Sequence, residues 1–298
     1  MRSFILKILL FALPVCTLLV FVEIQLRSRP NVYAAKKVQL DSLCSEIEIL
    51  CLGSSQIIHG INPDYFSKKV YNAANVSQSY DFDQKILEKY IDKMPELKTV
   101  VIPVSFFGFF LFLSDAEEFW RTKYYSLLMQ VSEPDMYEDY MLFGIERQDL
   151  LTYWISGTSQ LNINELGFDA GYKFEKRDRN LEKSGLVAAK RHTVSDFKRQ
   201  SDSRSIIESM INLCESRNIS VMLLMPPAHQ SYRDNLNKQQ LELTYSIVDS
   251  ILQKHENIIF IDEFANPIYQ DDDFFDADHL NDRGAVKLTK RIDNFLTN

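Results

Sequence analysis

The sequence lacks the features that mark nucleic-acid-binding and metal-binding proteins. It carries 33 Lys and Arg against 41 Asp and Glu, a formal net charge of −8, and it has no basic stripe interleaved with aromatic residues. Such a chain has no positive field for polyphosphate, so nucleic acid is not an expected partner. Its four cysteines show no spacing typical of a metal site or a redox pair. The acidic run at 271–273 lacks the glycine and terminal glutamate of a calcium-binding loop, and we expect neither a metal nor another cofactor.

The N-terminal segment is the one long apolar run. Residues 4–26, FILKILLFALPVCTLLVFVEIQL, are about the length that crosses a bilayer as a helix. We expect residues 1–26 to form an uncleaved transmembrane signal anchor, with a buried helix of a soluble protein as the alternative. Basic residues flank both sides of the run, so the positive-inside rule leaves its orientation open. Residues 27–44 are expected to form a polar juxtamembrane linker.

The remainder alternates short apolar runs with helix-period stretches, as expected of a globular protein with 46% hydrophobic residues. The apolar runs have the continuous Val, Ile and Leu character of strands buried on both faces of a parallel sheet. They lie at 46–53, 68–74, 98–107, 219–227 and 257–264. Helical stretches follow at 78–94, 201–218, 237–255 and 281–298. This order predicts a three-layer α/β domain over 45–298.

The segment at about 108–200 breaks this alternation. It is rich first in aromatic residues, as in FFGFFLFLSDAEEFW (106–120), and then in charge. We expect an inserted, mainly helical subdomain between the third and fourth strands. Its aromatic residues are expected to serve core or interdomain packing, with a substrate lid or a membrane-surface contact as the alternative.

Polar clusters follow each predicted strand, at the edge of a parallel sheet where ligands bind. In chain order the clusters contain Gly53, Ser54, Ser55, Gln56 and His59; Asn72, Asn75 and Ser77; Ser105; and Pro226, Pro227 and His229. Asp276, Asp278 and His279 precede the last helix on the same edge.

These residue types suit nucleophilic catalysis. A serine is a weak nucleophile until a base takes its proton, and the base works best when a carboxylate orients it. Asp276 and His279, three residues apart, can supply orienter and base from one loop. Gly53 allows a tight turn from strand to helix that exposes a hydroxyl. In the alternative interpretation Ser55 only caps that helix. Asp278 is expected to be solvated or a cap.

Four blocks carry a resemblance to a known superfamily. LGSSQ, NAANVSQS, VIPVSFF and DADHLN resemble the ordered blocks of the SGNH or GDSL hydrolases. The resemblance implies a flavodoxin-like parallel sheet and a triad of Ser55, His279 and Asp276, with Ser54 in the place of the usual aspartate. Within the superfamily, the anchor and the terminal Asp-x-x-His are similar to the D-alanyl-lipoteichoic acid biosynthesis protein and the alginate-type O-acetyltransferases. Those relatives act outside the cytoplasmic membrane on envelope polymers, often beside a membrane-bound O-acyltransferase.

The blocks also depart from the family pattern. Ala74 or Asn75 stands where a glycine N–H normally contributes to the oxyanion hole, and Ser105 stands near the place of an asparagine. His59 and His229 are candidates for substrate contacts, with a satisfied helix residue and a plain loop histidine as the alternatives.

The expected function is that of a membrane-anchored O-acyltransferase or esterase whose catalytic domain is extracytoplasmic and acts on an exported polysaccharide or envelope glycan. One alternative is a catalytically degenerate domain that binds glycan or scaffolds a membrane-bound acyltransferase. Another is a lipid esterase that faces the cytoplasm.

Overall fold

The computed structural model describes residues 2–133, 141–142 and 161–297. The chain divides into two compact units, the first of residues 1–37 and 120–161, the second of residues 38–119 and 162–298. The second unit contains both the sheet and the candidate site, and the two units are described separately.

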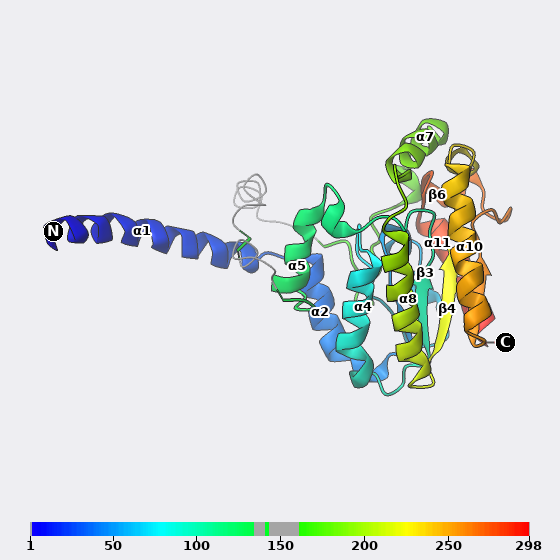
Figure 1. The fold of residues 1–298 in the computed structure, drawn as a ribbon, viewed down its shortest axis with the longest axis horizontal. Coiled ribbons are helices and arrows are strands. Elements are labelled where there is room, and N and C mark those ends of the chain that lie inside the picture. The colour runs from blue at the N-terminus through cyan, green and yellow to red at the C-terminus, as the bar shows by residue number, and fades with distance from the viewer. Residues whose placement is uncertain (1, 134–140, 143–160, 298) are drawn as a thin grey trace. The chain divides into compact units, whose positions relative to one another are not determined.

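The first unit contains the apolar N-terminal helix. Helix α1 spans Arg2–Arg27 (Figure 1), and Ser3–Arg27 is long and apolar enough to cross a membrane. The unit also contains α5, Thr122–Leu127, whose Tyr124 and Tyr125 rings pack against Tyr33 with centroids 5.1 and 4.9 Å away. Tyr33 lies in α2, a helix over Val32–Leu43. The segment expected to be a linker is therefore helical over most of its length.

The second unit is built on a five-stranded parallel sheet. Its strands are β1 (Ile49–Cys51), β2 (Val70–Asn72), β3 (Thr99–Pro103), β4 (Ser220–Met225) and β5 (Ile258–Asp262). Their order is β2-β1-β3-β4-β5, the flavodoxin-like arrangement, and each of the four pairings is parallel. All five predicted strands are present, and β1, β2 and β3 are buried throughout. The α/β fold class is confirmed.

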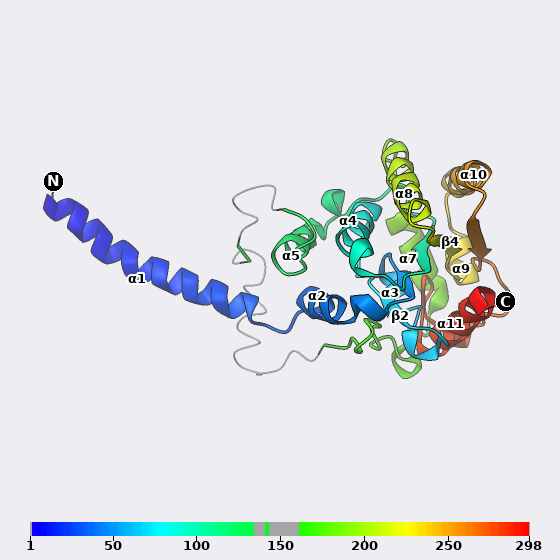
Figure 2. The ribbon, with the colours of Figure 1, turned by 90° about the horizontal axis from the view of Figure 1, so that it is seen from below.

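Helices cover both faces of this sheet. Helices α4 (Tyr80–Tyr90), α8 (Gln200–Glu215) and α10 (Lys238–Lys254) lie along one face, and α11 (Asp282–Thr297) lies on the other (Figures 1 and 2). Right-handed crossovers place α4, α8 and α10 on the same face, because β2, β3 and β4 each lead to a strand further along the sheet in the same direction. In α11 the buried side chains of Leu288 and Ile292 are four residues apart, which places them on one face of the helix.

A short antiparallel hairpin precedes α11. It pairs β6 (Phe274–Asp276) with β7 (His279–Leu280). Asn281 fixes it, since its Nδ2 atom donates to the carbonyls of Asp272 and Phe274 while its Oδ1 atom accepts from the N–H of Arg283. One buried amide thus joins the hairpin to the start of α11.

The expected insertion at 108–200 is described in part. Residues 134–140 and 143–160 lie outside the described residues, so the prediction is not tested there. The described portion contains α5 and α7 (Leu181–His192). Helix α7 packs closely on α9 (Gln230–Arg233), because a Cβ atom on Gly185 would come within 2.4 Å of the Ser231 hydroxyl.

Candidate active site

Ser55 stands at a tight turn after β1. Gly53 has φ +119, and a Cβ atom there would come within 2.3 Å of Pro103 Cγ, so only glycine fits without strain. The Gly53 N–H donates to the buried Asp83 carboxylate at 2.8 Å, which anchors the turn. Ser54 is the N-cap of α3 (Ser55–Ile58), although its side chain makes no capping hydrogen bond. Ser55 therefore begins the helix with its hydroxyl at the sheet edge.

Three predicted residues form a continuous hydrogen-bond chain. The Ser55 hydroxyl lies 2.8 Å from Nε2 of His279, and Nδ1 of the same ring lies 2.8 Å from Oδ1 of Asp276. With the proton on Nδ1, the ring donates to Asp276 and accepts from Ser55, the tautomer that a general base requires. Ser55 and His279 are 224 residues apart. The fold thus brings together a hydroxyl, an imidazole and a carboxylate in the order needed for nucleophilic catalysis.

Asp278 is a second carboxylate beside the same ring. Its side chain is only 3% exposed, and its Oδ2 atom lies 3.6 Å from His279 Nδ1 and 3.2 Å from Arg191 Nη2. The expectation that it is solvated or a cap is wrong, because the tight β6–β7 turn directs it into the protein. A buried carboxylate needs compensating charge, and Arg191 of α7 supplies it.

The two carboxylates change the titration of the ring. Burial lowers the pKa of His279, but the negative charges of Asp278 and Asp276 outweigh burial and raise that pKa to about 9. Burial raises the pKa of Asp276, yet the charge and hydrogen bond of His279 hold it below its ordinary value. Burial raises the pKa of Asp278. The resting ring therefore favours the imidazolium form at neutral pH, and the base is generated as the pH rises.

His192, the last residue of α7, forms another part of the site. It is buried, its Nδ1 atom lies 2.8 Å from the Tyr232 hydroxyl, and its Nε2 atom lies 3.9 Å from Asp278 Oδ2. Burial and the neighbouring Arg191 charge lower the pKa of His192 to about 3. This ring stays neutral and adds no charge beside His279.

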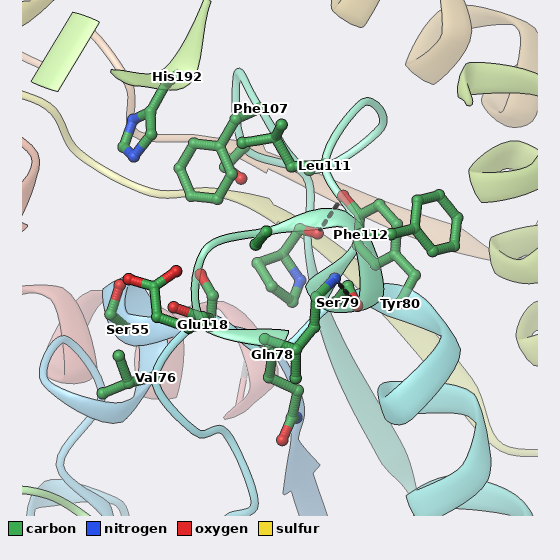
Figure 3. A pocket seen from close by; sticks show the side chains of 18 of the residues that line it. Ser55, Val76, Gln78, Ser79, Tyr80, Phe107, Leu111, Phe112, Glu118 and His192 are labelled. Atoms are coloured by element: carbon green, nitrogen blue, oxygen red, sulfur yellow. Dashed lines mark hydrogen bonds between the residues drawn. The ribbon is translucent and has the colours of Figure 1, made fainter. Parts of the chain in front are cut away.

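A cavity of about 580 Å³ opens over Ser55 (Figure 3). The chemically distinct groups around it are the Ser55 and His279 pair, a set of apolar side chains, and several charged side chains. Besides Ser55 and His279, its lining includes Ser54, Val76, Ser77, Tyr80, Ser105, Phe107, Leu111, Phe112, Leu113, Asp115, Glu117, Glu118, Tyr172, Arg191 and His192. The expected insertion thus contributes directly to this cavity, through Leu111 and Phe112.

The predicted N–H donors of the second block are already in use. The N–H of Ala74 donates to Asn72 Oδ1 at 3.1 Å, and that of Asn75 donates to the Gly53 carbonyl at 3.1 Å. Neither is available to an oxyanion, so this assignment is corrected. Ser77 is the remaining candidate in this block, because it lines the cavity, has φ +59, and its N–H has no partner among the described residues. A positive φ is a conformation that glycine adopts more readily.

Ser105 stands at the third position of the predicted oxyanion hole. Its side chain lines the cavity, and its hydroxyl makes no hydrogen bond within the described part of the chain. The α3 N-terminus leaves the Ser55 N–H without a partner in the same part of the chain. The two backbone donors and the Ser105 hydroxyl are therefore the groups that can meet a developing negative charge.

The two predicted substrate-contacting histidines lie outside the cavity lining. His59 is buried and stacks on Tyr172, with ring centroids 3.6 Å apart, and its Nδ1 atom is 3.2 Å from the Asp169 carbonyl. His229 caps α9, and its Nε2 atom lies 3.1 Å from Asp271. Both predictions are corrected. The Tyr172 ring packs edge-on against His279 with centroids 5.4 Å apart, and the His59 ring lies 6.3 Å from the His279 ring in the same orientation.

The donor atoms of Asp276, Asp278 and His279 lie within 4.8 Å of one another, close enough to hold a metal ion. Both ring nitrogens of His279 are already hydrogen-bonded, Nδ1 to Asp276 and Nε2 to Ser55. A metal on either ring nitrogen would displace one of those hydrogen bonds. The donor set therefore fits the protein hydrogen-bond chain better than it fits a cation.

Sequence reasoning missed Arg191, His192, Tyr172 and the role of Ser77. Arg191 and His192 belong to a helix inside the insertion, 87 residues from Asp278 in the sequence, and nothing in their local pattern indicates a site. Ser77 is recognisable only from its backbone conformation. Its position in a polar cluster after the second strand was the one available signal.

Comparison with protein-family models assigns the chain to a family. A family model described as "Protein of unknown function (DUF1574)" matches residues 53–292. The chain belongs to this family. The matched region begins at Gly53 of the serine turn and includes the hairpin that carries Asp276 and His279. No curated protein matches the sequence.

Three solved structures are similar in fold at low sequence identity. One is described as a candidate platelet activating factor from Streptococcus pneumonia, with 10% identity over 96% of this chain and 98% of that chain and a TM-score of 0.45. A candidate acylhydrolase from Bacteroides fragilis has 11% identity over 91% and 100%, with a TM-score of 0.44. A GDSL-like lipase from Bacteroides thetaiotaomicron has 11% identity over 88% and 99%, with a TM-score of 0.44.

Proposed function

We propose that the protein is a serine-dependent acyl-transfer enzyme of the SGNH type, either an O-acyltransferase or an esterase. The observation that carries this proposal is the hydrogen-bond chain from Ser55 through His279 to Asp276, with 2.8 Å at both steps. A serine that merely capped a helix would have no reason to meet an oriented imidazole from a hairpin 224 residues away. The neighbouring cavity provides room for a substrate.

The mechanism follows from these positions. Neutral His279 takes the Ser55 proton on Nε2 as Oγ attacks the acyl carbonyl, and Asp276 stabilises the imidazolium that forms. The N–H groups of Ser55 and Ser77 and the Ser105 hydroxyl donate to the oxyanion. Collapse breaks the ester bond, and His279 returns the proton to the leaving alcohol. Water or an acceptor hydroxyl then attacks the acyl-enzyme and gives its proton to His279, which passes it to Ser55 Oγ as the bond from Oγ to the acyl carbon breaks.

We further propose that α1 anchors the enzyme in the cell membrane with the catalytic domain outside the cytoplasm. The length and apolar character of Ser3–Arg27 support the anchor. The sequence resemblance to envelope-acylation proteins supports an exported polysaccharide or envelope glycan as acceptor, and a membrane-bound O-acyltransferase as partner. A reporter fused to the C-terminus that is active only outside the cytoplasm tests the orientation. Activity of a cytoplasm-specific reporter there would refute it and leave the lipid esterase alternative.

A fluorophosphonate probe tests the catalytic proposal, because it labels only activated serines. We expect the full-length protein in membranes to be labelled, and both Ser55→Ala and His279→Ala to abolish labelling. Ser54→Ala is the matched control, since Ser54 is adjacent, lines the same cavity and lies outside the hydrogen-bond chain. Labelling that survives Ser55→Ala, or no labelling of a folded protein, would favour a degenerate domain that binds glycan or scaffolds a partner.

A further inference from the structure

Part of the cavity lining is apolar. Val76 follows β2, whereas Phe107, Leu111 and Phe112 come from the segment after β3 (Figure 3). Tyr80, at the start of α4, completes this apolar wall. These five residues come from the segments that follow β2 and β3, which lie on either side of β1, so the wall does not depend on one segment alone.

Several polar atoms beside this wall are already hydrogen-bonded within the protein. The Tyr80 hydroxyl donates to the Pro103 carbonyl at 2.9 Å, and the Ser79 hydroxyl accepts from the Leu113 N–H at 3.0 Å (Figure 3). The Gln78 amide donates to Asp83 at 2.6 Å and accepts from Asn75 at 3.0 Å. A sugar buried here would lose hydrogen bonds to water and find few replacements, which is costly. A hydrocarbon chain makes no hydrogen bonds to water and would lose none on burial.

The size of the cavity indicates the length of that chain. An apolar protein cavity of about 150 Å³ is enough for benzene, which has six carbon atoms. The 580 Å³ over Ser55 is several times larger, so an acetyl group would fill only a small part of it. An acyl chain of about eight carbons fits with room left for the alcohol.

The charged side chains of the cavity favour a neutral acyl group. Asp115, Glu117 and Glu118 line it. Asp115 is paired with Arg199 at 2.6 Å. Arg191, the cation in the lining, is already paired with Asp278. An acyl group with a terminal carboxylate would meet acidic side chains and an apolar wall together.

We infer that the substrate of this site is an ester of a neutral, medium-length acyl chain, about six to ten carbons, which lies on the wall formed by Val76, Tyr80, Phe107, Leu111 and Phe112. This inference rests on the proposed function and goes beyond it by naming the acyl group. The carbonyl sits over Ser55, and the chain extends along the wall.

A chain-length series tests the inference on the full-length protein in lipid nanodiscs. The substrates are p-nitrophenyl acetate, butyrate and octanoate, each below its micellar concentration, with the mono-p-nitrophenyl ester of suberic acid as the carboxylate-ended analogue of octanoate. Complete burial can raise kcat/KM by up to about fourfold per methylene. We expect kcat/KM for the octanoate ester to exceed that for the acetate ester by about tenfold or more. We expect kcat/KM for the suberate ester to be at least about tenfold lower than that for the octanoate ester.

Two variants place the chain on the wall. Leu111→Trp and Val76→Phe add bulk from two different loops, and each should lower the octanoate-to-acetate ratio about tenfold. A thermal unfolding midpoint close to that of the wild type shows that each variant is folded. Ile268→Trp is the matched control, because Ile268 is 38% exposed and lies outside the lining, and the ratio should not change.

The outcomes separate this inference from the proposed function. Ser55-dependent acetate hydrolysis with no gain from acetate to octanoate would overturn the acyl-chain inference and leave the enzymatic proposal standing. Unchanged ratios in both wall variants would do the same. Absence of Ser55-dependent hydrolysis for every ester would count against the proposed function itself.

Discussion

The Oδ2 atom of Asp278 lies 3.6 Å from Nδ1 of His279 while Asp276 holds the same nitrogen at 2.8 Å. The candidate base thus faces two carboxylates where one is sufficient to orient it. The hydrogen bond assigns the orienting role to Asp276. The additional charge of Asp278 instead favours the protonated ring, which sets the pH at which the base becomes available.

Asp278→Asn should shift the pH profile of kcat/KM to lower pH. His279 must be neutral to accept the Ser55 proton, and the pKa of the ring is raised to about 9, so wild-type activity should rise about tenfold per pH unit up to that region. Removing the Asp278 charge destabilises the imidazolium, lowers this pKa and raises activity at pH 7 relative to the plateau. Asp249→Asn, an exposed change of equal charge, is the control. An acidic limb that does not move contradicts the role of Asp278.

Asp276→Asn should reduce kcat by about 10⁴, because an amide that donates to Nδ1 selects the wrong imidazole tautomer. The carboxylate accepts the Nδ1 proton at 2.8 Å, and an amide of equal shape leaves the packing intact. The comparison is between the kcat values of ester hydrolysis for the Asp276→Asn and Asp278→Asn variants, measured side by side. If the Asp278 substitution caused the larger loss of kcat at the pH plateau, the two roles would have to be exchanged.

Ser105→Ala should lower kcat with little change in KM. One oxyanion donor is worth about 10²–10³ in kcat, and a free hydroxyl is expected to lie toward the lower end of that range. Steady-state kinetics with a short ester separates the two constants. Ser216→Ala, a serine outside the cavity lining, should be silent, and an equal effect of the two changes would remove Ser105 from the oxyanion hole.

Gly53→Ala should destabilise the fold and displace Ser55. A non-glycine residue at φ +119 is strained, and the new Cβ would meet Pro103 Cγ at 2.3 Å. Strain of this kind costs about 1–3 kcal/mol before the steric overlap is counted. Denaturant unfolding measures the loss. Gly171→Ala is the control, since its Cβ would meet the movable Asp169 carboxylate at 2.9 Å, and Gly53→Ala should be the more destabilising of the two.

The sheet could be predicted from the sequence because its strands leave short apolar runs, although β5, where Ile259 is exposed, is not buried on both faces as expected. Strands β1 to β5 all fall within such runs, and their right-handed connections follow from general rules. The β6–β7 hairpin could not be found this way. Its strands are two and three residues long, and they lie within an acidic segment that shows neither alternation nor a continuous apolar run.

The candidate site was predictable where its residues sit at strand ends or in a spaced pair, as for Ser55, Asp276 and His279. It was not predictable where long-range packing decides. Arg191 lies beside Asp278 because α7 packs against the hairpin region. His59 lies outside the cavity lining, where its ring stacks on Tyr172. Whether a backbone N–H is available, as at Ser77, depends on hydrogen bonds that no residue pattern reveals.

The separation of Ser55 and His279 by 224 residues also orders events during synthesis. A growing polypeptide acquires its hydroxyl early but receives its proton acceptor only when the hairpin has emerged and docked. Any product that stops before Phe274 would carry an inert serine. The hydrogen-bonded pair of Ser55 and His279 therefore forms only in a molecule whose synthesis has passed the hairpin and whose sheet has folded.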